Sequence, residues 1–280
     1  MKHTISLALL GKFTEKMQED ERSKATIEKY LRDIRTFIAF VGGDGMIDKE
    51  TVIAYKTHLL EKYAPASVNS MLAAINSFFK ENGWYDCVVK AIKIQKETFR
   101  SGNKELTKEE YYRLLQAAKR KENQRLYMLL QTICSTGIRV SELEYITVEA
   151  LHTRRAVVSL KGKTRTVILP IELCRELKRY IKERNIKSGT IFVTRSGKPL
   201  DRSNIWQEMK ELCEAAGVDR EKVFPHNLRH LFACTYYQLK KDITHLADIL
   251  GHSNINTTRI YTLVSGEEQE KQISMLGFVV

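Results

Sequence analysis

The sequence has few of the features that mark secreted, membrane-bound or disulfide-stabilised proteins. No apolar run approaches the roughly 18 residues of a membrane-spanning helix, and the apolar stretch near the start is too short for a secretory signal peptide. The five cysteines are odd in number, lie far apart and form no Cys-x-x-Cys pair, which argues against a disulfide framework and a zinc site: Cys87, Cys134, Cys174, Cys213 and Cys234. We expect a soluble cytoplasmic protein with buried thiols.

Motifs for metal or nucleotide binding are also missing from the sequence. There is no cluster of Asp and Glu that would hold a catalytic metal ion. Gly162-Lys163-Thr164 lacks the upstream glycine of a phosphate-binding loop. We therefore expect neither a metal nor a cofactor.

Acidic residues are outnumbered by basic ones. The chain has 46 Lys and Arg against 34 Asp and Glu, a formal net charge of +12 and a pI near 9.4. This excess fits a polyanionic partner, although a solvated basic surface on an ordinary protein would give the same composition. With 280 residues, 43% of them hydrophobic, the chain can form about two domains of roughly 100–200 residues each.

The N-terminal part has helical periodicity and no strand pattern. Apolar residues recur every three or four positions from Ile27 to Ile38. Asp48 can cap a following helix, and Pro65 can begin another that ends at Gly83. A small helical bundle is predicted, with an apolar core and with Lys and Arg on its outer faces.

A basic segment separates this bundle from a second domain. The periodicity weakens between Lys90 and Lys104, where Lys and Arg are frequent. Thr107 and Glu110 then form a capping box at the start of a new helix. The predicted division is a helical domain at 1–96, a basic linker at 97–104 and a second domain at 105–280.

The second domain combines helices with a short β-hairpin. Two β-branched runs, 156–160 and 164–169, flank Lys161-Gly162-Lys163, which is typical of a hairpin. Residues 190–194 are a candidate for a third strand. One helix is predicted to end at Gly137 and another to begin at Pro225. A further helix is predicted over residues 243–250, where Gly251 ends it.

Five residues suited to phosphodiester chemistry follow one another in this domain. Arg139 lies in Thr-Gly-Ile-Arg-Val-Ser-Glu-Leu, and His226 and Arg229 lie in Pro-His-Asn-Leu-Arg-His. His252 follows Leu-Gly, and Tyr261 comes nine residues later. Two guanidiniums, two imidazoles and a phenol can hold the free oxygens of a phosphodiester and attack its phosphorus. The order and wording of these segments resemble the tyrosine recombinases of the phage-integrase family, from about residue 106 to 261.

The resemblance implies a fold and partners. The fold would be mainly α with a small antiparallel β-sheet in the catalytic domain. A helical core-binding domain of the SAM-like kind and a mixed α/β catalytic domain would close on duplex DNA as a clamp. The partners would be double-stranded DNA carrying an inverted-repeat recombination site and three further copies of the chain in a homotetramer, with no membrane. The chain looks most like the simple two-domain, Xer-like recombinases.

The resemblance also implies roles for the five residues. Tyr261 would attack the phosphorus and remain joined to the DNA as a 3′-phosphotyrosine, with His226 accepting its proton. Arg139 and Arg229 would hold the non-bridging oxygens, and His252 would add a hydrogen bond. Arg139 is expected to be oriented by Glu142, on the following turn.

A catalytic lysine completes the set that the resemblance implies. The match assigns it to Lys161, with Lys163 the less favoured candidate because the hairpin turn is shorter than in many relatives. It would protonate the departing 5′-oxygen. The expected catalytic residues are thus Arg139, Lys161, His226, Arg229, His252 and Tyr261.

Two other functions are compatible with this set of residues. A type IB topoisomerase would share the fold and the chemistry but relax DNA as a monomer. A DNA-binding regulator could keep the fold without catalysis, although the complete residue set disfavours it. The apolar segment 273–280 is expected, by resemblance, to dock into a neighbouring protomer.

Overall fold

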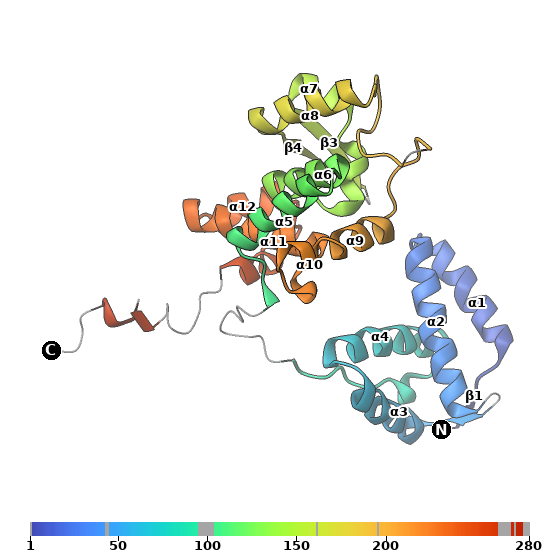
Figure 1. The fold of residues 1–280 in the computed structure, drawn as a ribbon. Helices are drawn as coiled ribbons and strands as arrows, with labels where there is room; N and C mark the ends of the chain where they lie inside the picture. The colour runs from blue at the N-terminus through green and yellow to red at the C-terminus, as the bar shows by residue number, and fades with distance from the viewer. Residues whose placement is uncertain are drawn as a thin grey trace. The chain divides into compact units, whose positions relative to one another are not determined.

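The computed structural model describes residues 2–42, 45–94, 104–160, 162–194, 196–262, 270–271 and 273–276. The chain divides into two compact units, Met1–Lys96 and Glu97–Val280, which Figure 1 colours blue to teal and green to red. Both units are mainly helical, as predicted. Among the described residues, no helix combines the length and the apolar character needed to cross a lipid bilayer.

The first unit is a four-helix bundle with an aromatic core. Phe37, Tyr55, Phe78 and Phe79 are fully buried in it. The expected helix starts are present, since the Asp48 carboxylate accepts the backbone N–H of Thr51 at 2.9 Å and Pro65 occupies the first turn of its helix. The helices are α1 (Leu7–Glu19), α2 (Lys24–Val41), α3 (Lys49–Lys62) and α4 (Pro65–Glu81), followed by the 3₁₀ turn η1 (Tyr85–Cys87).

Two very short strands in this unit were not predicted from the sequence. β1 (His3–Thr4) pairs antiparallel with β2 (Met46–Ile47). Strands of two residues are too short to show an alternating pattern. Their pairing joins the start of the chain to the segment before α3.

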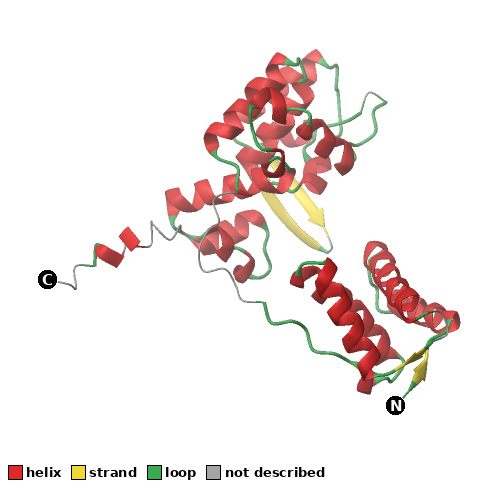
Figure 2. Ribbon diagram, turned by 60° about the horizontal axis from the view of Figure 1, so that its bottom comes forward, coloured by secondary structure: helices red, strands yellow, loops and turns green. Residues whose placement is uncertain are grey.

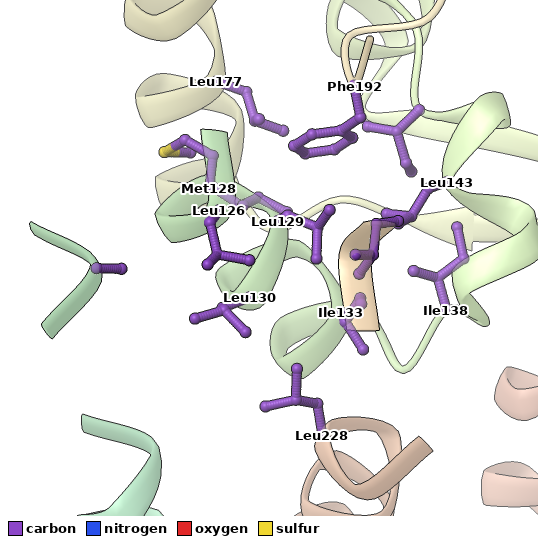
Figure 3. Packing of buried hydrophobic residues seen from close by; sticks show 14 of the residues in the cluster. Leu126, Met128, Leu129, Leu130, Ile133, Ile138, Leu143, Leu177, Phe192 and Leu228 are labelled. Atoms are coloured by element: carbon purple, nitrogen blue, oxygen red, sulfur yellow. The ribbon is translucent and has the colours of Figure 1, made fainter. Parts of the chain in front are cut away.

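The second unit is built around α6, whose apolar face lies at the centre of the core. Figure 3 shows Leu126, Leu129 and Ile133 of this helix packed among side chains from α8 and α11, including Leu177 and Leu228. The helices are α5 (Lys108–Arg120), α6 (Gln124–Thr136), α7 (Val148–Thr153), α8 (Ile171–Glu183), α9 (Arg202–Lys210), α10 (Cys213–Ala216), α11 (Pro225–Lys240) and α12 (Ile243–Leu250). Short 3₁₀ turns include η3 (Val140–Tyr145), η5 (Ile255–Thr257) and η6 (Arg259–Tyr261).

The predicted hairpin is present, and the predicted third strand is not. β3 (Arg155–Leu160) pairs antiparallel with β4 (Lys163–Ile168), from Arg155 opposite Ile168 to Leu160 opposite Lys163; these are the long yellow strands of Figure 2. Residues 190–194 form only isolated bridges, Thr190 with Thr147 and Val193 with Pro199. A β-branched run forms a strand only where a neighbouring strand pairs with it continuously. Among the described residues, none pairs continuously with 190–194.

A smaller apolar cluster joins the last elements of the chain. Ala233 and Cys234 of α11 pack with Leu246 and Leu250 of α12 and with Tyr261 of η6. This cluster brings the C-terminal turn that carries Tyr261 against the helix that carries His226 and Arg229.

Candidate active site

The end of α6 determines where Arg139 lies. Gly137 caps the helix in the left-handed conformation (φ 65°), as predicted. A Cβ atom at this position would lie 2.4 Å from the ring of Phe232, so both the backbone conformation and the space require glycine. Ile138 is fully buried, and Arg139 follows at the start of η3.

A buried carboxylate holds Arg139. Glu142 is fully buried, and its two oxygens accept the backbone N–H and the guanidinium of Arg139, both at 2.8 Å. The expected contact between the two residues is therefore present. Burial alone would raise the pKa of Glu142, but hydrogen bonds from Arg165 and Arg139 outweigh burial and lower the pKa to about 2.

Arg165 is a site residue that the sequence reasoning missed. It lies on β4, and its guanidinium donates to both oxygens of Glu142, at 2.7 and 2.9 Å. It also lies opposite the buried Val158 in the hairpin register. The available signal was its position two residues before Val167, which places both on the inward face of a strand.

Arg229 is clamped at the centre of the site. It is 2% exposed, and its guanidinium donates to the carbonyls of Gly137 at 2.5 Å and Leu250 at 2.7 Å. A third hydrogen bond runs to Nε2 of His252 at 3.0 Å. Burial, together with the charge of Arg139, lowers the pKa of Arg229 to about 10, so the guanidinium remains positively charged at neutral pH.

These contacts assign the tautomer of His252. Because Arg229 can only donate, Nε2 of His252 must be the unprotonated nitrogen. Nδ1 then carries the proton and donates to Oγ1 of Thr258 at 2.9 Å; Thr258 is fully buried and was not identified from the sequence. Partial burial and the charge of Arg229 lower the pKa of His252 to about 4, which agrees with a neutral ring.

Tyr261 lies between two imidazole rings. It is 3% exposed; its ring centroid is 5.0 Å from that of His230, edge to face, and 6.2 Å from that of His252, nearly parallel. Burial raises the pKa of Tyr261, and the charge of Arg229 acts in the opposite direction. The phenol is therefore a poor nucleophile until its proton is removed.

His226 occupies the first turn of α11, one turn before Arg229, as predicted. The residue is exposed. The pKa of His226 is lowered because part of the ring is withdrawn from water and because positive charges lie nearby, first those of Arg229 and Arg139. A neutral imidazole at neutral pH can accept a proton.

Lys104 and Glu105, near the start of the second unit, contact α11, the helix that carries His226. This connection was not predicted from the sequence. The Asn227 side chain is 5% exposed and donates to the carbonyls of Lys104 at 2.9 Å and Lys222 at 2.7 Å. One turn later, Nε2 of His230 lies 3.7 Å from a carboxylate oxygen of Glu105. The position of Asn227 between His226 and Arg229 was the available signal.

Lys161 lies outside the described residues. Leu160 and Lys163 pair across the end of the hairpin, and Gly162 has a left-handed backbone (φ 72°). The assignment of the catalytic lysine to Lys161 therefore stays a prediction. The structure describes the other five predicted catalytic residues, which are Arg139, His226, Arg229, His252 and Tyr261. They lie on α11 itself and on segments that either pack against α11 or hydrogen-bond to Arg229.

Comparison with protein families decides the classification. A family described as the phage integrase family matches residues 104–268, and one described as the phage integrase N-terminal SAM-like domain matches residues 9–82. The chain belongs to the phage integrase family. Among its relatives, tyrosine recombinase XerA of Thermococcus kodakarensis is 30% identical over 272 residues, which cover 94% of this chain and 93% of the relative. Tyrosine recombinase XerD of Halalkalibacterium halodurans is 31% identical over 265 residues, covering 87% and 88%.

Solved structures agree with this classification. The crystal structure of XerA recombinase is 25% identical and matches with a TM-score of 0.55 over 98% of this chain and 99% of that one. A lambda integrase dimer bound to a COC′ core site matches with a TM-score of 0.75 at 18% identity, over 92% and 77%, and shows the fold alone. This protein is thus a site-specific DNA recombinase of the Xer/integrase type, and the two alternative functions are not favoured.

Proposed function

We propose that this recombinase cleaves and rejoins DNA strands through a 3′-phosphotyrosine on Tyr261. The observation that carries the proposal is that His252 and Tyr261 lie together beside Arg229. Its guanidinium contacts His252 at 3.0 Å, and the ring of Tyr261 lies beside that of His252. A phosphodiester that reaches this guanidinium would lie next to the phenol.

The two arginines would bind the non-bridging oxygens of the scissile phosphate. Arg229 is held by two backbone carbonyls and Arg139 by Glu142, so both guanidiniums are oriented before the substrate arrives. Fixed charges of this kind stabilise the additional negative charge of the phosphorane without reorganisation. Glu142, held in turn by Arg165, would position Arg139.

Strand cleavage would involve two proton transfers, one from the phenol of Tyr261 and one to the departing 5′-oxygen. The oxygen of Tyr261 attacks the phosphorus while His226 accepts the phenolic proton. The bond between the phosphorus and the 5′-oxygen breaks, and Lys161 gives that oxygen a proton. The phosphotyrosine keeps the ester, so a 5′-hydroxyl from another strand can reverse the step without ATP or metal.

His252 would change its protonation state when the phosphate binds. In this structure Nε2 accepts a hydrogen bond from Arg229, and the pKa is about 4. The negative charge of a phosphodiester raises the pKa of a nearby imidazole. Protonated at Nε2, the ring can donate to a non-bridging oxygen, while Thr258 continues to hold Nδ1.

The two units would act as a DNA clamp. The first unit matches the N-terminal SAM-like domain of the family, and the chain carries a net charge of +12, which suits contacts to phosphate on both sides of a duplex. We assign 1–96 to a core-binding domain, 97–104 to the linker and 105–280 to the catalytic domain. The substrate would be a duplex with inverted repeats, in the cytoplasm, where the five free thiols remain reduced.

Four copies would assemble on two such duplexes. A cavity of about 320 Å³ between α5, the end of α6 and α11 is lined largely by apolar side chains, including Tyr111, Leu231, Phe232 and Leu239. Ile273, Met275 and Leu276 near the C-terminus are exposed, and Gly277–Val280 lie outside the described residues. Insertion of this segment into the cavity of the next copy would close a ring. A lambda integrase tetramer bound to a Holliday junction shares the fold, with a TM-score of 0.74.

Holliday junction formation tests the function. A duplex selected from a random pool by its binding to the protein would be supplied in two lengths, so that junctions migrate separately from substrates. The proposal expects junctions and recombinant products with EDTA present. Relaxation of supercoiled plasmid by a monomer without junctions would favour a topoisomerase, and binding without any covalent step would favour a regulator.

A further inference from the structure

Three side chains with metal-binding atoms meet in the first unit, far from the catalytic residues in sequence. Nε2 of His3 lies 2.9 and 3.1 Å from the two carboxylate oxygens of Asp86. Together with the thiol of the adjacent Cys87, all three donor groups lie within 4.8 Å of one another. Cysteine spacing alone argued against a zinc site, because it gives no indication that His3 and Asp86, 83 positions apart, meet.

The three donors lie on β1 and η1 and differ in burial. His3 lies in β1, opposite Ile47 of β2, and its ring stacks on Trp84 with a centroid distance of 4.9 Å and an interplanar angle of 18°. Asp86 and Cys87 belong to η1. Cys87 is fully buried, whereas the Asp86 side chain is 41% exposed. The cluster therefore has a buried side and a side open to solvent.

We propose that His3, Asp86 and Cys87 bind a divalent transition metal ion, with Zn²⁺ the preferred occupant. Imidazole, carboxylate and thiolate are the ligand types that Zn²⁺ takes, and three protein ligands leave the fourth tetrahedral position to water on the exposed side.

Binding would replace protons with the metal. The thiol proton of Cys87 would pass to solvent and the ring proton of a neutral His3 would lie on Nδ1, so that Nε2, the thiolate and a carboxylate oxygen of Asp86 would each donate a lone pair to the ion. The ion would connect β1 to η1 and stabilise the first unit by an amount that rises with the logarithm of its free concentration once this exceeds the dissociation constant.

Cobalt spectroscopy on the full-length, chelator-treated protein tests the proposal. Titration with Co²⁺ should produce a thiolate-to-cobalt charge-transfer band that saturates at one ion per chain and that Zn²⁺ abolishes. His3→Gln should weaken binding by roughly 10-fold or more, and Cys87→Ser should remove the band. Zn²⁺ should raise the melting temperature of the wild-type protein and leave that of Cys87→Ser unchanged.

Cys234→Ser is the matched control, because Cys234 also lies beside an imidazole, 3.4 Å from His230. It should keep the band. If Cys87→Ser does not fold, His3→Gln decides the question, because the His3 side chain is partly exposed and is not part of the buried core. The proposal is overturned if the wild type gives no band, if His3→Gln binds Co²⁺ as tightly as the wild type, or if the band is lost in Cys234→Ser and kept in Cys87→Ser.

Discussion

Glu142 accepts two hydrogen bonds from Arg165, at 2.7 and 2.9 Å, although 23 residues separate the two in sequence. Glu142 also holds Arg139 and is fully buried. Glu142→Gln would leave two guanidiniums without their counter-ion. We expect the free energy of unfolding to fall by about 3 kcal/mol, near the lower end for a broken buried pair because Arg139 stays partly in water.

The same substitution should slow DNA cleavage, since Arg139 loses the group that orients it. Glu144→Gln is the control, because Glu144 lies two residues away and is exposed; its effect on stability should stay within about 0.5 kcal/mol. Urea unfolding and single-turnover cleavage measure the two effects. Equal behaviour of the two variants would show that Glu142 does not organise the site.

Acidification should destabilise the protein partly through His252. The pKa of His252 is lowered to about 4 in the folded protein, whereas in the unfolded chain it returns to about 6.5. Between these values the unfolded state binds more protons, so the free energy of unfolding decreases as the pH falls from about 6.5 towards 4 and is unaffected by this group above that range.

We expect the melting temperature to fall less between pH 7 and pH 5 in His252→Asn than in the wild type. His226→Asn should act in the same direction, because the pKa of His226 is also lowered. Calorimetry at both pH values measures the difference. A fall in His252→Asn as large as that of the wild type would mean that the ring is already charged in the folded protein.

The ends of the helices could be predicted from the sequence because they depend on local chemistry. Gly137 and Gly251 cap their helices in the left-handed conformation, Pro225 occupies a first turn, and Thr107 forms the predicted capping box with Glu110. Each of these involves only neighbouring residues, so a single-residue preference decides the outcome.

Contacts between distant segments could not be predicted in the same way. Arg165 reaches Glu142 only because the hairpin packs beside η3, and Asn227 meets the carbonyl of Lys104 across 123 positions. The run 190–194 has strand-forming residues but makes only isolated bridges. In each case tertiary packing decides which distant segment the residue meets, and this choice leaves no periodic signal.

The role of Lys161 can be tested with a better leaving group. A thiol has a pKa of about 8.5 and departs as thiolate without being given a proton. Lys161→Ala should cleave normal DNA roughly 10²–10⁴-fold more slowly and recover much of that rate on DNA with sulfur at the scissile 5′-bridging position. Arg229→Ala should not recover, because the non-bridging oxygens gain charge whichever atom leaves.

Lys163→Ala separates the two candidate lysines. If this variant is rescued while Lys161→Ala behaves like the wild type, the acid lies two residues further along the hairpin. Rescue of neither variant would remove the lysine role and leave an imidazole as the better candidate.

Removal of the C-terminal segment should weaken assembly. Truncation after Ser274 deletes Met275 and Leu276, both exposed, and Leu239→Glu places a charge at the rim of the proposed acceptor cavity. Both should reduce tetramers on DNA, measured by light scattering, and spare the binding of a single site. Ile171→Glu, at an exposed position on α8 away from the cavity, should assemble normally. Unchanged assembly of the truncated protein would exclude the docking.

The covalent adduct on Tyr261 is the most direct test of the proposed chemistry. Labelled duplex would be incubated with the wild type and with Tyr261→Phe, denatured in detergent and separated, and the adduct of the wild type would be digested and mapped by mass spectrometry. Only the wild type should give a covalent band, unchanged by EDTA, with the nucleotide attached to Tyr261, while Tyr261→Phe binds the duplex with near-normal affinity. A band from Tyr261→Phe, a nucleotide on another residue, or loss of the wild-type band in EDTA would contradict the account.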